Sequence, residues 1–192
     1  MRSSSQHCSS VAAHSVAIIG GGFIGKAVAK TFLAADWQVS VLDRNPPPLD
    51  MQPCHGVAWV TGDAEDSALL DSVLRESEIA YYLVCTSIPG GECVHAGEEL
   101  LVNFDMALKF FNACSRNKVG SVVFASSAAV YGIQPPIPVD ELAVTNPISV
   151  YGIQKLGVEK LFILESAQRQ INLVILRISN PYGPGQNIFG VQ

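Results

Sequence analysis

Charged residues are scarce in this chain, and the basic ones form no cluster. Only 15% of the 192 residues are charged, 48% are hydrophobic, and the formal net charge is −5 at pH 7. Such a chain can bury a substantial core, but it offers no polycationic surface to a nucleic-acid backbone or an acidic membrane. We therefore expect neither nucleic acid nor a membrane as partner. The length suits one domain, or one domain with part of another.

The signatures of metal sites and disulfide frameworks are also missing. The cysteines are odd in number, and none is spaced as C-x-x-C: Cys8, Cys54, Cys85, Cys93 and Cys114. The histidines lack the spacing of metal ligands: His7, His14, His55 and His95. These observations predict no disulfide and no metal site, and they favour buried thiols in a reducing cytoplasm.

A long apolar segment is the third absence. Roughly 18 consecutive apolar residues are needed for a transmembrane helix, and no run of that length occurs. The N-terminal stretch MRSSSQHCSSVAAHS has no apolar core of the kind found in signal peptides. We predict that residues 1–14 form a loose tail and that the protein is cytoplasmic.

Short apolar runs alternate with longer segments of helical periodicity. The predicted strands are Ser15–Ile19, Gln38–Leu42, Val57–Val60, Ile79–Cys85, Ser121–Ala125 and Leu173–Ile178. The predicted helices are Phe23–Ala35, Ser67–Arg75, His95–Asn117 and Ser149–Arg169. This alternation predicts an α/β fold, a doubly wound parallel sheet of the Rossmann type with helices on both faces.

The stretch VAIIGGGFIGKAVAKTFLAADWQVSVLDR contains the pattern G-x-G-x-x-G at Gly20, Gly22 and Gly25. In this pattern the first glycine permits a tight turn, the second admits a pyrophosphate, and the third packs the helix against the strand. Asp43 follows 18 residues after Gly25, where a carboxylate accepts hydrogen bonds from an adenosine ribose and repels a 2′-phosphate. The pattern predicts an NAD site, although Arg44 weakens the preference over NADP. The alternative is a glycine-rich turn without a ligand.

Tyr151 and Lys155 are four residues apart in a predicted helix, so both side chains lie on one face. Ser127 follows the preceding predicted strand, at the sheet edge where ligands bind. A phenol has a pKa near 10, and one ammonium at about 4 Å offsets the roughly 4 kcal/mol needed to bring it near 7. Tyr151 would then accept a hydroxyl proton while hydride leaves for NAD, and Ser127 would orient that hydroxyl. The alternative is a packed aromatic, a solvated lysine and a turn serine.

Several ordered motifs resemble the extended short-chain dehydrogenase/reductase family, in its NAD-dependent epimerase/dehydratase group. They are GGGFIG, GDAED at Gly62–Asp66, SSAAVYG at Ser126–Gly132, YGIQK at Tyr151–Lys155 and LRISNPYGPGQ at Leu176–Gln186. The resemblance implies that Ser127, Tyr151 and Lys155 are catalytic. It also implies that Lys155 contacts the nicotinamide ribose and that Ser127 contacts the substrate.

The resemblance implies further roles along the chain. Asp63 would lie near the adenine amino group, although the alternative is an N-cap for the next helix. Asn103 matches an asparagine with a structural role, and Asn180 matches one near the substrate. A homodimer is implied through helices 95–117 and 149–169, whose surplus apolar residues are equally compatible with a core. The candidate cofactor-binding residues are Gly20, Gly22, Phe23, Ile24, Gly25, Asp43, Arg44, Asp63, Tyr151 and Lys155.

The chain departs from the family pattern in three ways. Ile19 stands where the family loop has its first glycine, so the loop has the shorter G-x-G-x-x-G spacing. Ala128 and Ala129 replace the acidic pair of the dehydratases, which disfavours a sugar 4,6-dehydratase. The chain ends about a hundred residues earlier than the family, so most of the substrate domain is expected to be missing.

The sequence therefore predicts an NAD-dependent, nucleotide-sugar epimerase-like oxidoreductase that acts by hydride transfer at a sugar hydroxyl. Two alternatives stay open: an NAD(P)-dependent reductase of a keto-sugar or small carbonyl compound, and a catalytically inactive NAD-binding fragment. We expect residues 15–180 to form the NAD-binding domain. Residues 181–192 would begin a truncated substrate-binding region.

Overall fold

The sheet of this protein is parallel and six-stranded within the residues that the computed structural model describes, 14–51, 56–86, 95–133 and 137–186. The strand order is β3-β2-β1-β4-β5-β6. This is the doubly wound order, in which strands are added on one side of β1 up to β3 and on its other side from β4 onward. The strands are β1 (Ser15–Ile19), β2 (Gln38–Asp43), β3 (Val57–Thr61), β4 (Ile79–Tyr82), β5 (Ser121–Ser127) and β6 (Asn172–Ile178).

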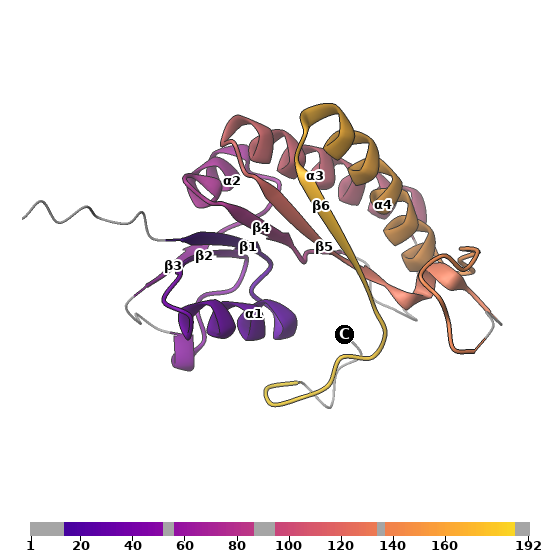
Figure 1. Cartoon of the computed structure of the whole chain (residues 1–192), viewed down its shortest axis with the longest axis horizontal. Helices are drawn as coiled ribbons and strands as arrows, with labels where there is room; N and C mark the ends of the chain where they lie inside the picture. Colours follow the sequence, from indigo (N-terminus) through magenta and orange to yellow (C-terminus); the bar gives the residue numbers. More distant parts are fainter. Residues whose placement is uncertain (1–13, 52–55, 87–94, 134–136, 187–192) are drawn as a thin grey trace, which may run out of the picture.

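Helices cover both faces of this sheet (Figure 1). α1 packs on one face, against β1 and β2, whereas α2, α3 and α4 lie side by side on the other. Two 3₁₀ turns, η1 (Leu49–Met51) and η2 (Ala128–Tyr131), follow β2 and β5. The α-helices are α1 (Phe23–Leu33), α2 (Ser67–Leu74), α3 (Ala96–Arg116) and α4 (Val150–Arg169). The predicted doubly wound α/β fold is confirmed.

The two faces hold unequal cores. The larger one, beneath α2, α3 and α4, contains Tyr82, Phe110, Phe124 and Phe162. The contacting rings of this group have centroids 4.7 to 6.0 Å apart, a separation typical of aromatic clusters. The smaller core lies beneath α1. α1 packs on β1 and β2 and does not reach β6. On the α1 side of the sheet, β6 is therefore not covered by a described helix, and its Val174 and Leu176 are 48% and 44% exposed.

The ends of β2 and β3 and the start of β6 lie one residue from their predictions, and two strand ends differ by more. β4 ends at Tyr82 instead of Cys85, because its neighbour β1 ends at Ile19 and the two residues are in register. The apolar run continues beyond β4 because Leu83, Val84 and Cys85 line a cavity. β5 continues to Ser127, two residues beyond the prediction, because β6 pairs with it as far as Ile178. Ser127 is therefore a strand residue.

Of the predicted loose tail, only His14 lies within the described residues. Its ring stacks on Trp37 with centroids 4.8 Å apart, and its Nδ1 lies 3.0 Å from Glu78. Of the cysteines, Cys114 is buried and Cys85 is half-buried, and the other three lie outside the described ranges. Among the described helices none is both long and apolar enough to span a membrane.

Candidate active site

A cavity of about 880 Å³ opens at the carboxyl ends of the strands, a volume typical of small-molecule sites. It lies where the strand order reverses, which is where doubly wound sheets bind ligands. All the predicted site residues line it: Gly20, Gly22, Phe23, Ile24, Gly25, Asp43, Arg44, Asp63, Ser127, Tyr151, Lys155 and Asn180. The fold thus brings together residues that are up to 160 positions apart in the sequence.

The backbone shapes the glycine end of the cavity. Gly20 has φ +107°, in the left-handed region that favours glycine, and its N–H donates to the Leu42 carbonyl at 2.8 Å. A Cβ on Gly25 would lie 1.9 Å from the Gly20 carbonyl oxygen, so the helix approaches the strand end too closely for any side chain. A Cβ on Gly22 would meet nothing within 4 Å, because this residue faces the cavity.

The first turn of α1 has the features of an anion-binding site. Among the described residues no side chain caps its N-terminus, which begins after Gly22. The uncapped N–H groups and the helix dipole favour a phosphate there. Ile19, where the family has a glycine, is a fully buried residue of β1 paired with Leu42 and Tyr82. The glycine loop of this chain therefore begins only after Ile19.

Asp43 at the end of β2 holds the loop in place. Its Oδ2 accepts from the Gly21 N–H at 2.7 Å, and its Oδ1 accepts from the Asn45 N–H at 2.8 Å. Trp59 on β3 completes this corner by donating from its indole to the Asn45 carbonyl at 3.0 Å. A Cβ on Gly21 would lie 2.3 Å from the Trp59 ring. Sequence reasoning missed Trp59, because no local pattern links it to the glycine loop.

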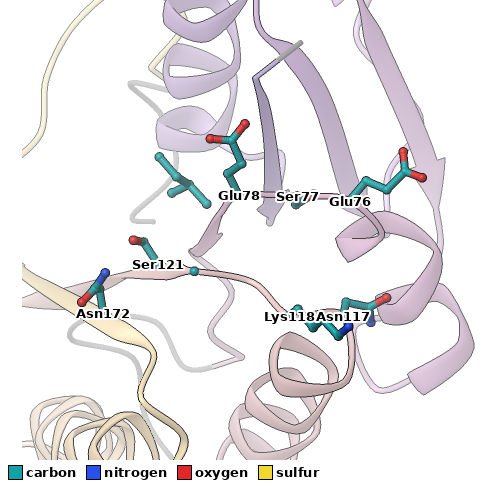
Figure 2. A pocket seen from close by; sticks show the side chains of 9 residues that line it. Glu76, Ser77, Glu78, Asn117, Lys118, Ser121 and Asn172 are labelled. Atoms are coloured by element: carbon teal, nitrogen blue, oxygen red, sulfur yellow. The ribbon is translucent and has the colours of Figure 1, made fainter. Parts of the chain in front are cut away.

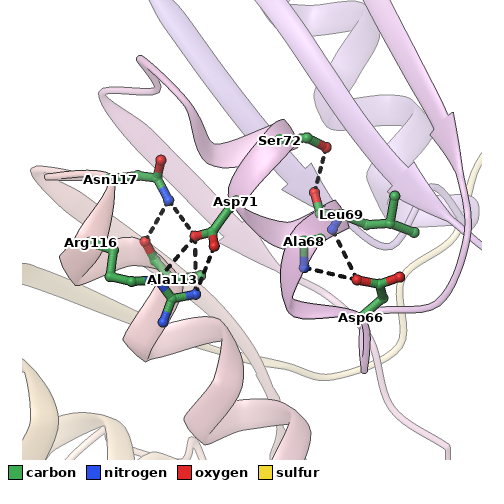
Figure 3. A network of polar contacts seen from close by, with 8 residues as sticks. All are labelled: Asp66, Ala68, Leu69, Asp71, Ser72, Ala113, Arg116 and Asn117. Atoms are coloured by element: carbon green, nitrogen blue, oxygen red, sulfur yellow. Dashed lines mark hydrogen bonds and ion pairs between the residues drawn. The ribbon is translucent and has the colours of Figure 1, made fainter.

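Asp63 lines the cavity but does not cap α2, so the alternative reading of Asp63 as an N-cap is wrong. Asp66 is the cap, and its Oδ1 accepts from the N–H groups of Ala68 and Leu69 at 2.8 and 3.2 Å (Figure 3). Asp63 accepts from the Glu65 N–H at 2.9 Å, within the turn before the helix. The spacing from Asp63 to the first helical turn is too long for a capping bond.

Three elements form the catalytic end of the cavity. Ser127 is the last residue of β5, and its Oγ accepts from the Ala129 N–H at 3.2 Å. Ser149 caps α4 by accepting from the Gly152 N–H at 3.1 Å, which places Tyr151 in the first turn. The Ser127 side chain is close enough to the Tyr151 phenol to lower its pKa. Lys155 lies one turn further, with its Nζ 5.8 Å from the centroid of the Tyr151 ring.

The expected effect of Lys155 on the phenol is wrong for the polypeptide alone. Burial raises the pKa of Tyr151, and the Ser127 side chain only partly opposes this. Burial also lowers the pKa of Lys155, which is 5% exposed. The ammonium donates to the Ala125 carbonyl at 2.8 Å, and its Nζ lies 5.8 Å from the centroid of the Tyr151 ring. The two side chains are therefore in place, but the pKa of the Tyr151 phenol is not lowered in the polypeptide alone.

Further side chains meet at this end that sequence reasoning did not assign. Cys85 lines the cavity, and its Sγ accepts from Gln154 Nε2 at 3.5 Å. The sequence feature that could have pointed to Cys85 is the apolar run of β4, which continues beyond the end of the strand. Asn103 on α3 holds the same segment, since its Oδ1 accepts from the Thr86 N–H at 3.0 Å. The structural role expected for Asn103 is confirmed.

A second, shallower hollow lies at the amino-terminal edge of the sheet, opposite the cavity. Figure 2 shows Glu76, Glu78, Asn117 and Lys118 around it. Its walls are turn residues and strand starts, and none of the predicted site residues lies there. Among the described residues no three His, Cys, Asp or Glu side chains gather as metal ligands, there or elsewhere. The chemistry-bearing residues thus lie at the other edge.

Comparison with known proteins agrees with this geometry. The sequence profile of the NAD dependent epimerase/dehydratase family matches residues 16–190. UDP-glucose 4-epimerase of Yersinia pestis is 31% identical over 175 residues, which cover 85% of this chain and 52% of the relative. The chain therefore spans about half the length of the curated relatives it matches.

Two solved structures share the fold at detectable identity. UDP-N-acetylglucosamine 4-epimerase from Methanobrevibacter ruminantium M1, in complex with UDP-N-acetylmuramic acid, has a TM-score of 0.80 at 28% identity, over 91% of this chain and 57% of that one. UDP-glucose 4-epimerase from Brucella ovis, in complex with NAD, has a TM-score of 0.77 at 25% identity, over 88% and 52% of the two chains.

Proposed function

Because the chain belongs to the NAD dependent epimerase/dehydratase family, we propose that it binds NAD and acts by hydride transfer at the hydroxyl of a nucleotide sugar. One observation carries the proposal: the glycine loop and the Ser127–Tyr151–Lys155 group line one cavity. The NAD complex of the related Brucella ovis epimerase supports the choice of cofactor. A dinucleotide is the class of ligand that joins a phosphate-binding helix terminus to a distant acid–base pair.

The residues of the glycine end fit an adenosine diphosphate. The uncapped turn at Phe23, Ile24 and Gly25 would bind the pyrophosphate, since its N–H groups are free to donate. Asp43 would accept from the adenosine ribose through its Oδ2, which keeps a lone pair beside the bond from Gly21, whereas Oδ1 already accepts two bonds from Asn45. Asp63 would accept from the adenine amino group. Arg44 lies next to this site, where it would contact the same nucleoside.

The residues of the catalytic end would move one proton. When bound, the cofactor supplies a hydride acceptor and a positive charge beside Tyr151. Tyr151, whose pKa burial raises, would remove the sugar hydroxyl proton where such a charge opposes the effect of burial. Ser127 orients the same hydroxyl. Lys155 stays close to the phenol and donates to the ribose of the nicotinamide half.

A nucleotide-sugar epimerase fits the remaining residues better than a dehydratase. Ala128 and Ala129 line the cavity after Ser127 and offer no carboxylate to remove a carbon-bound proton. An epimerase needs only removal and return of a hydride. Asn180 would contact the substrate from the segment after β6. The related epimerases with UDP-sugar ligands support this substrate class.

A second candidate function is dinucleotide binding without turnover. The raised pKa of Tyr151 and the lowered pKa of Lys155 both favour the neutral side chains, which is the opposite of an acid–base device poised to react. In this function the glycine end alone would be used.

The proposal includes an organisation of the chain. Residues 15–180 would form the NAD-binding domain, and residues 181–192 would begin the substrate-binding region. A cytoplasmic homodimer would form through α3 and α4, where Leu101 and Leu164 are 74% and 61% exposed. Size-exclusion chromatography with light scattering tests the dimer: a monomer at micromolar concentration would contradict this part.

One experiment separates the candidate functions. The chain is incubated with NAD and UDP-galactose, the C4 epimer is followed by nuclear magnetic resonance, and NADH is followed by absorbance. Formation of UDP-glucose without net NADH supports the epimerase. Net consumption of NADH with a keto substrate supports a reductase instead. NAD binding without any turnover, unchanged by Tyr151→Phe, would overturn catalysis in favour of the binding module.

A further inference from the structure

A buried ion pair lies directly behind the catalytic end of the cavity. Glu159 on α4 is 1% exposed, and both its oxygens are bonded by Arg177 on β6: Nε to Oε1 at 3.0 Å and Nη2 to Oε2 at 2.8 Å. Among the ion pairs of the described residues it is the most buried. The Ser126 hydroxyl on β5 donates to Glu159 Oε1 as well.

Arg177 extends this network to a fourth segment. Its Nη1 donates to the Tyr131 hydroxyl at 3.0 Å and to the Glu141 carbonyl at 2.9 Å. Its guanidinium carbon lies 4.9 Å from the centroid of the Tyr131 ring. The pair therefore joins α4, β5 and β6 to the residues that connect β5 with α4. These are the elements that carry Ser127, Tyr151 and Lys155.

One face of α4 meets the end of β5 at three consecutive strand residues. Tyr151, Lys155 and Glu159 are spaced by four residues, so they form one stripe along the helix. Tyr151 lines the same cavity as Ser127, and Lys155 donates to the Ala125 carbonyl. Glu159 accepts from the residue between them, Ser126. Tyr151 and Lys155 are catalytic in the proposed function, and Glu159 is not.

We infer that Glu159, fixed by Arg177, is a positioning residue that sets the register of α4 on β5 and thereby holds the Tyr151 phenol at Ser127. The inference rests on the proposed function for the reaction it serves. A helix held only near its N-terminus can still roll and slide on a sheet. A contact eight residues beyond Tyr151, about 12 Å along the axis, removes both freedoms.

Charge explains why this position carries a glutamate and not an apolar residue. A buried carboxylate is stable only when it is paired and its lone pairs are used. The fork of Arg177 supplies both needs and fixes the carboxylate plane, because a guanidinium binds a carboxylate through two parallel bonds. The remaining capacity of Oε1 is directed at Ser126. A leucine at position 159 would fill space but would define neither a direction nor a register.

The alternative is that the pair only stabilises the fold, and two variants distinguish these roles. Ser126→Ala removes the bond to β5 and leaves the ion pair intact. Arg177→Lys keeps the positive charge but loses the fork. The control is Arg116→Lys at the Asp71–Arg116 pair, where Nη2 lies 3.0 Å from both oxygens (Figure 3). That pair joins α2 to the end of α3, and neither residue lines the cavity.

We expect both variants to fold and to bind NAD within about twofold of the wild type, because the glycine end is untouched. Turnover of UDP-galactose should fall roughly tenfold to a hundredfold, the effect of misplacing a reacting group by about 1 Å. Arg116→Lys should not change turnover. If Ser126→Ala and Arg177→Lys keep wild-type turnover, or lose turnover and NAD affinity in equal measure, the positioning role is wrong.

A readout without turnover separates this inference from the proposed function. The ionisation of Tyr151 is measured as the difference in tyrosinate absorbance between each protein and its Tyr151→Phe counterpart. The Ser127 side chain lowers the pKa of the Tyr151 phenol. If Ser126→Ala moves the phenol away from Ser127, the ionisation of Tyr151 should shift to higher pH, whereas Arg116→Lys should leave it unchanged. A wild type without turnover but with this shift would overturn the reaction and support the positioning. An unchanged ionisation would overturn the positioning alone.

Discussion

The two ends of the cavity are built from different materials. The glycine end is formed by the main chain: Gly20 is left-handed, Gly25 makes a contact too close for a side chain, and the N-terminus of α1 is uncapped. The catalytic end is formed by side chains. The described residues contain six buried polar or charged side chains, and four of them lie at this end, Ser126, Gln154, Lys155 and Glu159.

This difference determines which property a substitution changes at each end. The main-chain contacts leave no room for an added atom at Gly25, and the charges beside them come from the side chains of Asp43, Arg44 and Asp63. A buried polar site keeps its shape when one group is replaced by another of similar size, yet its chemistry depends on every partner. Substitutions should therefore act on binding and stability at the glycine end, and on turnover at the catalytic end.

The largest effect should come from Tyr151→Phe, which removes one oxygen from the catalytic end. Turnover of UDP-galactose should fall by about 10²- to 10⁴-fold, the usual contribution of a general acid–base group. NAD affinity by calorimetry should be unchanged within about twofold. Tyr182→Phe is the control, since Tyr182 is 90% exposed and does not line the cavity. Equal turnover in the two variants would remove the phenol from the mechanism.

The second effect concerns Gly25→Ala at the glycine end. Its Cβ would lie 1.9 Å from the Gly20 carbonyl oxygen, and main-chain atoms cannot yield as a flexible side chain does. The free energy of unfolding in urea should fall by about 3 kcal/mol or more, at the upper end for overpacking, and NAD binding should be lost.

Gly22→Ala provides the matched comparison at the same loop. No atom lies within 4 Å of the added methyl group, so stability should stay within about 0.5 kcal/mol of the wild type. NAD affinity should nevertheless fall, because the methyl group occupies the approach of the pyrophosphate. Should Gly22→Ala bind NAD like the wild type, the phosphates do not lie over this loop.

The same contrast explains what could be predicted from the sequence. The fold and the glycine end were visible because they depend on local patterns: apolar runs, G-x-G-x-x-G, and Asp43 after the second strand. Tyr151 and Lys155 were visible because they share one helix face. Glu159 and Arg177 were not, since their pairing requires β6 to lie beside β5. The direction of the Tyr151 pKa was wrong for a similar reason, because burial is a property of the fold.

A third, smaller effect separates structure from binding at the adenine side. Asp66→Ala removes the cap of α2 and should lower the free energy of unfolding by about 1 kcal/mol. NAD affinity should be unaffected. Asp63→Ala is the counterpart and should leave the cap intact while weakening NAD. Chemical denaturation and calorimetry on both variants check the pair, and a reversed pattern would mean that the two aspartates exchange roles.

The smallest effect on stability tests whether the catalytic end opposes folding. Burial lowers the pKa of Lys155 below its ordinary 10.5, so between the lowered value and 10.5 the unfolded chain holds a proton that the folded chain releases. Within that window the free energy of unfolding rises with pH. Lys155→Met removes this dependence and should stabilise the chain at neutral pH, while turnover is lost. Subtracting the two unfolding curves cancels the opposite contributions of Cys114 and Tyr82, whose pKa values are raised by burial.

Lys160→Met is the control on the same helix, because Lys160 is exposed. A destabilised Lys155→Met would mean that the bond from the ammonium to the Ala125 carbonyl outweighs the cost of burying the charge. The catalytic end would then support the fold as the glycine end does. A stabilised variant would instead show that the chain keeps a buried ammonium for its chemistry, at a measurable cost that the main-chain site does not incur.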